Sequence, residues 1–172
     1  MTRARKTAPV PAAEIVSEAS SDLARLPAPT LAMRERILAA CATNDIEALR
    51  IPIDWNELRP LFERSGARPA GADPIEVLMS LSFDRKGRES LRLAREVLTQ
   101  PFVQITRGPV TLYEWPAFAR RPAPPADEEA SRALWSCVRF ADLPRSNEEG
   151  RPHVTRLAIG ADGVWHYFWN VG

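Results

Sequence analysis

The C-terminal segment His153–Asn170 constrains the fold more than any other stretch, because it has the pattern of a β-hairpin. Two runs rich in β-branched and aromatic residues flank a Gly-Ala-Asp-Gly sequence at 160–163, which has the composition of a tight turn. Gly163 can adopt a positive φ at no steric cost, and the Asp162 side chain can hydrogen-bond to nearby backbone. We therefore predict two paired strands, and we expect the second, which is apolar on both faces, to be an inner strand of a sheet.

Strict alternation along the second strand divides its side chains between two faces, with Trp165, Tyr167 and Trp169 on one and Val164, His166 and Phe168 on the other. The first set has two interpretations. It is either the packed face of a central strand or a stacking platform for a sugar, a base or a proline-rich peptide. In the second case Trp165, Tyr167 and Trp169 would bind a carbohydrate or peptide ligand.

The length of the chain favours a single globular domain that follows an N-terminal tail, and its charge bears on the binding partners. The chain has 172 residues, with 23 basic and 22 acidic side chains and a net charge of +1. No electrostatic argument therefore supports binding to nucleic acid or to an anionic membrane. Residues 1–29 contain four prolines and no ordered helical pattern. We predict a disordered or loosely docked tail at 1–29 and one α+β domain at 30–172.

Helical patterns precede strand patterns along the chain. Apolar residues or helix-capping residues predict helices at 30–41, 54–62, 74–81, 88–99 and, after the first strands, from Asp127. The period changes to two in 102–106 and 110–115, and the stretch 143–152 is polar and typical of a loop. This order predicts an α+β fold with N-terminal helices and a mostly antiparallel sheet. A nuclear-transport-factor-like or cystatin-like cone fits the same order.

Cysteine and histidine residues are too few and too scattered to predict a structural metal site. They are Cys41, Cys137, His153 and His166, and none has Cys-x-x-Cys or His-x-x-x-His spacing. We therefore expect no metal and no cofactor. Buried free thiols are the leading interpretation of the two cysteines, whereas a disulfide between them would fit an exported protein.

The N-terminal residues do not have the pattern of a secretory signal. Three basic side chains are followed by an alanine- and proline-containing stretch rather than by an apolar core of about 7 to 15 residues. No run of about 18 apolar residues occurs in the sequence. We expect a cytoplasmic protein without a transmembrane segment, and a periplasmic or exported location is the alternative.

Two short motifs give the chain a resemblance to known sequences. Residues Tyr113–Ala119 read Tyr-Glu-Trp-Pro-Ala-Phe-Ala, and Gly160–Phe168 includes Asp-Gly-Val-Trp-His. They resemble a group of small uncharacterised alphaproteobacterial proteins, many of which look exported, and the likeness extends over residues 35–170. The resemblance implies no catalytic role for any residue, because no activity is established for that group.

His166 is the candidate acid–base residue, since a histidine that faces a cavity can exchange a proton near neutral pH. It would need a carboxylate to orient its ring. Glu114 is the first candidate because both residues lie on predicted strands, and Asp54 is the second. A structural histidine with satisfied hydrogen bonds is nevertheless the leading interpretation of His166.

Arg88, Arg92 and Arg95 lie near one side of the predicted helix 88–99, at spacings of three and four residues. Such a row can clamp a phosphate or a carboxylate. Glu89 and Glu96 are interleaved at distances that allow ion pairs, so a solvated helix face is the leading interpretation.

Trp115 and Phe118 belong to a Trp-Pro-Ala-Phe segment beside a proline-rich stretch. An exposed apolar segment of this kind is typical of an interface, here for a homodimer or a protein partner. The segment fits equally well as a lid that folds back over the core of its own domain.

The leading functional hypothesis is a non-catalytic binding or protein-interaction module. The alternatives are a small pocket enzyme, a hydrolase or isomerase that uses His166, and a carbohydrate or peptide binder that uses the aromatic residues of the last strand. The sequence has no Gly-x-Ser-x-Gly elbow, no phosphate-binding glycine loop and no dinucleotide fingerprint. Catalysis is therefore the less favoured interpretation.

Overall fold

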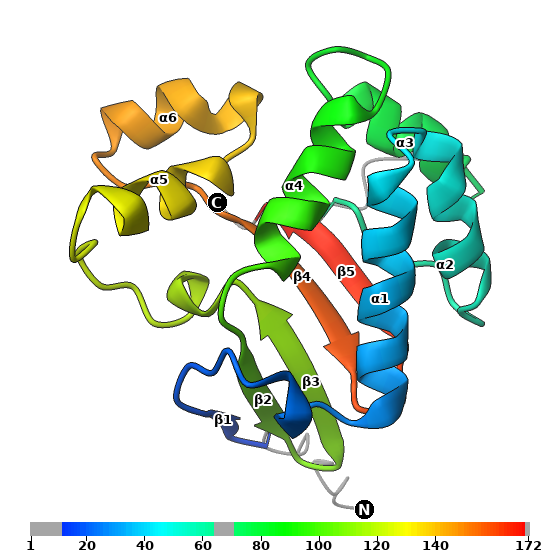
Figure 1. Ribbon diagram of the computed structural model, residues 1–172, viewed down its shortest axis with the longest axis horizontal. Coiled ribbons are helices and arrows are strands. Elements are labelled where there is room, and N and C mark those ends of the chain that lie inside the picture. Colours follow the sequence, from blue (N-terminus) through cyan, green and yellow to red (C-terminus); the bar gives the residue numbers. More distant parts are fainter. Residues whose placement is uncertain (1–11, 64–70, 171–172) are drawn as a thin grey trace, which may run out of the picture.

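The structure is a computed structural model that describes residues 12–63 and 71–170. Its centre is an antiparallel sheet of five strands in the order β1-β2-β3-β4-β5 (Figure 1). The strands are β1 Glu14–Val16, β2 Val103–Arg107, β3 Val110–Trp115, β4 Thr155–Gly160 and β5 Trp165–Asn170. The predicted α+β class with a mostly antiparallel sheet is confirmed.

Six α-helices accompany the sheet in the described residues. They are α1 Ala28–Ala42, α2 Arg50–Asp54, α3 Pro74–Leu81, α4 Arg88–Leu98, α5 Glu128–Ser136 and α6 Leu143–Glu148. Helices α1 and α4 lie side by side across the sheet, whereas α5 and α6 form a separate pair toward one side (Figure 1). None of these helices is long and apolar enough to cross a membrane. The resemblance of the sheet to the cone-shaped folds stays a prediction.

Helix α4 follows the predicted 88–99 pattern closely. Its apolar residues at helical spacing, Leu91, Ala94, Val97 and Leu98, are all buried. The helix begins after Gly87, which has φ +79°, and an added Cβ there would lie 2.8 Å from the Ile46 Cβ. Both the backbone conformation and the close approach therefore require glycine.

The C-terminal hairpin forms as predicted, with its turn at Asp162 and Gly163. Gly163 has φ +86°, and Oδ1 of Asp162 accepts a hydrogen bond from the Val164 amide at 3.0 Å. The hydroxyl of Thr30 in α1 donates to the Gly160 carbonyl at 2.7 Å. The first turn of α1 is thereby tied to the end of β4.

Strand β5 is the last strand of the sheet and not an inner strand, so this part of the prediction is wrong. Its outer edge is bridged by Leu61. The Leu61 amide donates to the His166 carbonyl at 3.0 Å, and the Phe168 amide donates to the Leu61 carbonyl at 2.8 Å. The sequence could not indicate this, because the segment around Leu61 has no strand pattern of its own.

A β-bulge interrupts the pairing between β4 and β5. Ala158 pairs with Tyr167, but the next residue, Ile159, pairs with Trp165. His166 is therefore the additional residue of β5. Because a bulge shifts the alternation of side chains by one residue, Trp165 and Tyr167 lie on opposite faces of the sheet.

The N-terminal tail is docked where the structure describes it. Residues 14–16 form β1, which pairs antiparallel with β2, and Ser20 bridges Phe102. Sequence patterns could not foresee this, because the partner strand is about ninety residues away. Residues 1–11 lie outside the described part of the chain.

Two further segments differ from the prediction. The helix expected at 54–62 is not formed, since α2 ends at Asp54 and its early Pro52 is compatible with a first helical turn. The stretch 143–152 was expected to be a loop, but it contains α6, which has a proline in its first turn.

Candidate functional site

The two faces of the sheet carry different kinds of side chain. One face packs against α1 and α4 and contributes to the main apolar core, with Leu157, Ile159, Trp165 and Phe168 all at 0% exposure. The other face carries a small apolar cluster formed by Val103, Ile105 and Ala117. It also carries most of the charged residues of the strands, and these surround a cavity.

This cavity of about 560 Å³ extends across all five strands, and we call it the sheet-face cavity. Its polar lining residues are Glu14, Arg107, Glu114, Arg120, Arg156 and Tyr167. Its apolar lining residues are Ile105, Val110, Leu112 and Trp169. The volume lies within the range that is typical of small-molecule sites in proteins.

Glu114 on β3 is the centre of the polar network in the sheet-face cavity, and it is fully buried. Arg120 binds its carboxylate through two nitrogens, with Nε 2.8 Å from Oε1 and Nη2 3.3 Å from Oε2. The Tyr167 hydroxyl donates to Oε2, and Nη1 of Arg156 lies 3.8 Å from Oε1. These partners offset the large free-energy penalty of removing a carboxylate from water.

The network continues from Glu114 to the edge of the sheet. Nη1 of Arg120 donates to Oε1 of Glu14 at 3.0 Å, and the other oxygen of Glu14 accepts a hydrogen bond from Arg107. The side chain is fully buried for Glu114, about one quarter exposed for Arg120 and Glu14, and 62% exposed for Arg107. Alternating charges therefore connect the buried centre of the cavity with solvent.

The Tyr167 hydroxyl and the Arg120 guanidinium each keep their proton near neutral pH. Burial, followed by the Glu114 carboxylate, raises the pKa of Tyr167 well above its usual value. Burial alone would lower the pKa of Arg120, but the contacts with Glu114 outweigh this effect and raise it. Tyr167 therefore acts as a hydrogen-bond donor, and Arg120 stays a cation.

Tyr167 and Trp169 form a stacked aromatic pair at one end of the cavity. Their ring centroids are 4.6 Å apart, and their planes differ by 9°. Both side chains are partly exposed and line the cavity. They present a flat apolar surface beside the polar network, which is the arrangement that ring-shaped ligands need.

Trp165 does not belong to this aromatic surface, although alternation predicted that it would. It is fully buried on the helix-covered face and packs edge-on against Phe62, with ring centroids 5.7 Å apart. Trp165 lies on this face because the bulge at His166 shifts the alternation of side chains along β5 by one residue. Of the two interpretations, the packed face therefore holds for Trp165, and only Tyr167 and Trp169 lie together on the cavity side.

His166 is not paired with either of the carboxylates proposed for it. Glu114 is bound by Arg120 and Tyr167 instead, and Asp54 is exposed at the end of α2. His166 is also not among the residues that line the sheet-face cavity.

The imidazole of His166 lies against the hairpin turn. An added Cβ on Gly160 would come within 2.9 Å of its Nε2 atom. Burial lowers the pKa of His166, and the carboxylate of Asp162 opposes this shift without cancelling it. His166 is therefore mainly neutral at pH 7, in a position that favours the structural interpretation.

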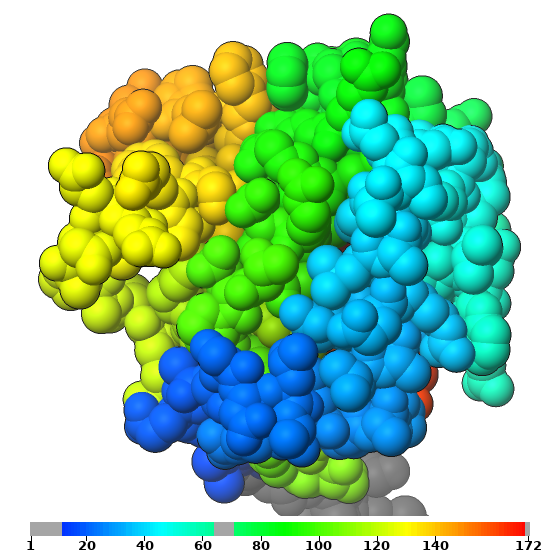
Figure 2. Space-filling model, in the orientation of Figure 1, coloured from blue at the N-terminus to red at the C-terminus, as the bar shows by residue number. Residues whose placement is uncertain are grey.

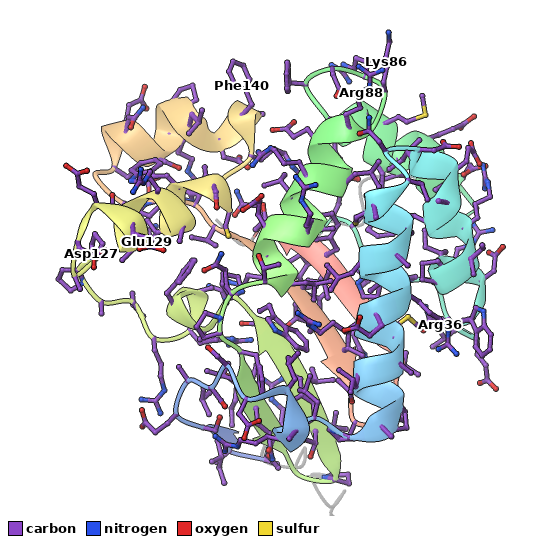
Figure 3. All side chains as sticks on the ribbon, in the orientation of Figure 1. Arg36, Lys86, Arg88, Asp127, Glu129 and Phe140 are labelled. Atoms are coloured by element: carbon purple, nitrogen blue, oxygen red, sulfur yellow. The ribbon has the colours of Figure 1, made fainter. Side chains whose placement is uncertain are left out.

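The arginines of α4 do not converge on one point. Nη1 of Arg92 donates to the Ser136 carbonyl at the end of α5, at 2.8 Å. Arg95 lies 3.9 Å from Glu96, and Arg88 is exposed at the N-terminal end of α4 (Figure 3). None of the three arginines lines the sheet-face cavity. The arrangement favours the solvated helix face over the anion clamp.

The Trp115–Phe118 segment folds back over the core of its own domain. Trp115 is fully buried, with its ring centroid 5.4 Å from that of Phe102. Phe118 is half-buried and packs against the main core. Trp115 is therefore not available as an interface residue, and of the two interpretations its burial favours the lid over the domain's own core. Homodimerisation by another surface stays a prediction.

Sequence reasoning identified Glu114 but missed Arg120, Arg156 and Glu14. A weak signal existed for Arg120, because it follows Glu114 by six residues and a proline between them can reverse the chain. No signal existed for Glu14, which reaches Arg120 across 106 residues of sequence.

No group of three or more His, Cys, Asp or Glu side chains is placed to hold a metal ion within 12–63 and 71–170. No protein-family model matches the chain, and comparisons with curated proteins and with solved structures found no similar protein. The resemblance of the two sequence motifs to the alphaproteobacterial group stays a prediction. Function is therefore inferred from the geometry of the sheet-face cavity.

Proposed function

We propose that the protein is a non-catalytic binding domain that takes a small, ring-bearing anion in its sheet-face cavity. One observation carries the proposal: the fully buried carboxylate of Glu114, held by Arg120 and Tyr167, forms part of the wall of a 560 Å³ cavity. A buried ion pair is often no more stabilising than apolar residues of the same volume. Its place in a cavity wall therefore favours a role in orienting a ligand.

The side chains around the cavity favour binding over catalysis. Its described lining residues include no serine, threonine, cysteine, lysine or histidine. The pKa values of Tyr167 and Arg120 are raised, so neither group exchanges a proton readily near neutral pH. A general acid or base works best when its pKa lies near the operating pH. The polar groups are thus suited to hold a ligand by fixed hydrogen bonds.

The charge and shape of the cavity indicate the ligand class. Three arginines line it against two glutamates, so an anionic group completes the charge balance. The partly exposed Trp169, stacked on Tyr167, offers a surface for a flat ring. Ile105 and Leu112 provide apolar floor between the charged residues. A small molecule with a ring and a carboxylate or phosphate fits these features.

A thermal-shift screen of aromatic carboxylates and nucleoside monophosphates, each with a neutral analogue, tests the proposal. A ligand present at about 100 times its Kd should raise the melting temperature by about 5 to 10 °C. Trp169→Ala should abolish that rise because it removes the outer ring of the stack. Trp55→Ala is the matched control, since Trp55 is 63% exposed and does not line the cavity.

Two results would contradict the proposal. The first is that no anion in the panel raises the melting temperature more than its neutral analogue. The second is that Trp169→Ala and Trp55→Ala respond to the ligand as the wild-type protein does. Either result would mean that the charged network serves only to fasten residues 116–121 to the sheet.

A further inference from the structure

A second cavity of about 550 Å³ lies beside the proline-rich loop 122–125 and under α5. The molecule is visibly hollowed between this loop and the start of α5 (Figure 2). The remaining wall is formed by Phe118 and Ala119, by residues 150–154, which lead into β4, and by Arg156 of β4. We call it the proline-loop cavity. It shares a single lining residue, Arg156, with the sheet-face cavity.

The walls of the proline-loop cavity are mainly apolar. Pro122, Pro124 and Pro125 face Leu134 and Trp135 of α5. Helix α5 has an apolar side, yet none of its residues is fully buried, and Leu134 and Trp135 are both only half-buried. An amphipathic helix normally buries its apolar side against a partner. Here that side borders a cavity large enough for a ligand.

The polar lining of this cavity is entirely basic. Arg151, His153 and Arg156 line it, and no aspartate or glutamate occurs among its described lining residues. His153 is 4% exposed, and its Nε2 atom lies 2.9 Å from Oε2 of Glu149, outside the lining. Nη2 of Arg156 donates to the carbonyl of Ala119 on the cavity wall, at 3.0 Å. Arg156 is therefore held with its guanidinium group in the partition between the two cavities.

We infer that the proline-loop cavity binds an apolar monocarboxylate, with its hydrocarbon part between the prolines and Trp135 and its carboxylate toward Arg156. Apolar walls favour the hydrocarbon part by removing it from water. Glu149 already binds Arg151 and His153, so the guanidinium group of Arg156 is the group to which we assign the negative head group. A guanidinium group is well suited to bind a carboxylate. The inference does not rest on the function proposed for the sheet-face cavity. Arg156 lines both cavities, but they share no other lining residue, and Trp135 and Trp169 each line one of them.

Isothermal titration calorimetry with decanoate as the probe and 1-decanol as its uncharged counterpart tests the inference. The wild-type protein should bind decanoate at least about tenfold more tightly than decanol, which corresponds to one charge-assisted hydrogen bond. Arg156→Gln should remove this difference by weakening decanoate binding at least about tenfold while leaving decanol binding unchanged. Trp135→Ala should weaken the binding of both compounds.

Two control variants test whether decanoate binds in the proline-loop cavity and not at a neighbouring site. Arg145→Gln should leave decanoate binding unchanged, because Arg145 binds Glu149 as Arg151 does but does not line the cavity. Trp169→Ala should also leave it unchanged, since Trp169 lines only the sheet-face cavity. Circular dichroism and the melting temperature of each variant establish that it is folded.

The inference is overturned by any of three results with folded protein: no binding of decanoate to the wild type, equal binding of decanol and decanoate, or unchanged binding in Trp135→Ala. Loss of decanoate binding in Trp169→Ala would instead place the ligand in the sheet-face cavity and would also overturn it. Failure of decanoate to bind leaves the thermal-shift screen of the sheet-face cavity unaffected, because that screen is read through Trp169. The two proposals can thus fail separately.

Discussion

Tyr167 on β5 reaches across β4 to hydrogen-bond with the carboxylate of Glu114 on β3. Between them, in the same row of the sheet, lies Ala158, which pairs with both residues and is fully buried. The methyl group of Ala158 is small enough for the tyrosine ring to pass over it. The contact at the centre of the sheet-face cavity therefore depends on a small side chain in the intervening strand.

Ala158→Leu should break the contact between Tyr167 and Glu114, because the larger side chain occupies the space between them. The free energy of unfolding in urea, measured for each variant of a double-mutant cycle, tests whether the contact is broken. In the wild-type background Tyr167→Phe should lower the free energy of unfolding by about 1 to 2 kcal/mol, since the hydroxyl bonds a charged group. In the Ala158→Leu background Tyr167→Phe should have almost no effect. Ala158→Gly is the control, and equal effects in all three backgrounds would contradict the spatial argument.

Glu114→Ala should destabilise the fold more than Glu14→Ala, although both residues bind Arg120. Removal of the buried Glu114 leaves the Tyr167 hydroxyl and two nitrogens of Arg120, Nε and Nη2, without their acceptor. We expect a loss of about 2 to 3 kcal/mol, less than for a wholly buried pair because Arg120 is partly exposed. Glu14→Ala should cost about 1 kcal/mol or less. Equal losses in urea unfolding would show that the burial of Glu114 has no energetic consequence.

Trp165→Ala and Trp169→Ala should differ strongly in stability, even though both residues belong to β5. Trp165 is fully buried, so its truncation should lower the free energy of unfolding by about 3 to 5 kcal/mol. Trp169 is partly exposed and stacks on one ring, so its truncation should cost about 1 to 2 kcal/mol. Similar values for the two variants would mean that the bulge does not separate these side chains as described.

Glu149 should make the stability depend on pH in acid. Hydrogen bonds from Arg145 and then Arg151 lower the pKa of Glu149 from 4.5 to about 2, although burial acts in the opposite direction and His153 adds a smaller effect. A carboxyl group with a lowered pKa in the folded state stabilises above its unfolded pKa and loses this effect as the pH falls toward the folded value. The stability difference between wild type and Glu149→Gln should therefore shrink from pH 4.5 to pH 2. A difference that stays constant over this interval would contradict the assignment.

Cys41 and Cys137 should be unreactive in the native protein. Both are buried free thiols, and burial raises the pKa of each to about 12. Because the thiolate is the reactive form, Ellman's reagent at pH 8 should react slowly with the folded protein and rapidly in urea. Fast reaction of one thiol in the native state would show that it is accessible.

The sequence predicted the elements that local chemistry determines. Helix α4 was recognisable because its apolar residues follow the helical period, and α3 and α5 were recognisable from the capping residues Asp73 and Asp127. Asp127 and Glu129 lie at the outer end of α5 (Figure 3). The hairpin was recognisable from its Asp-Gly turn. Each of these signals lies within a few residues of its effect.

The contacts that form the site could not be predicted in the same way. Glu14 meets Arg120, and Thr30 meets Gly160, across more than one hundred residues of sequence. Alternation along β5 placed Trp165 on the wrong face of the sheet. The histidine at position 166 gives no indication that a bulge lies there. Glu114 was identified as a candidate, but its partners depend on how β3, β4 and the chain after Pro116 assemble. Burial and pairing are properties of the assembled sheet.

The bulge at His166 has a consequence for how this sheet can vary. A chain that lacked His166 would still pair Trp165 with Ile159 and Tyr167 with Ala158, now in unbroken alternation, so the cavity and the core would keep their aromatic side chains. What it would lose is the carbonyl to which Leu61 donates. The attachment of the Leu61 segment and the position of Tyr167 in the sheet-face cavity therefore depend on different residues of β5.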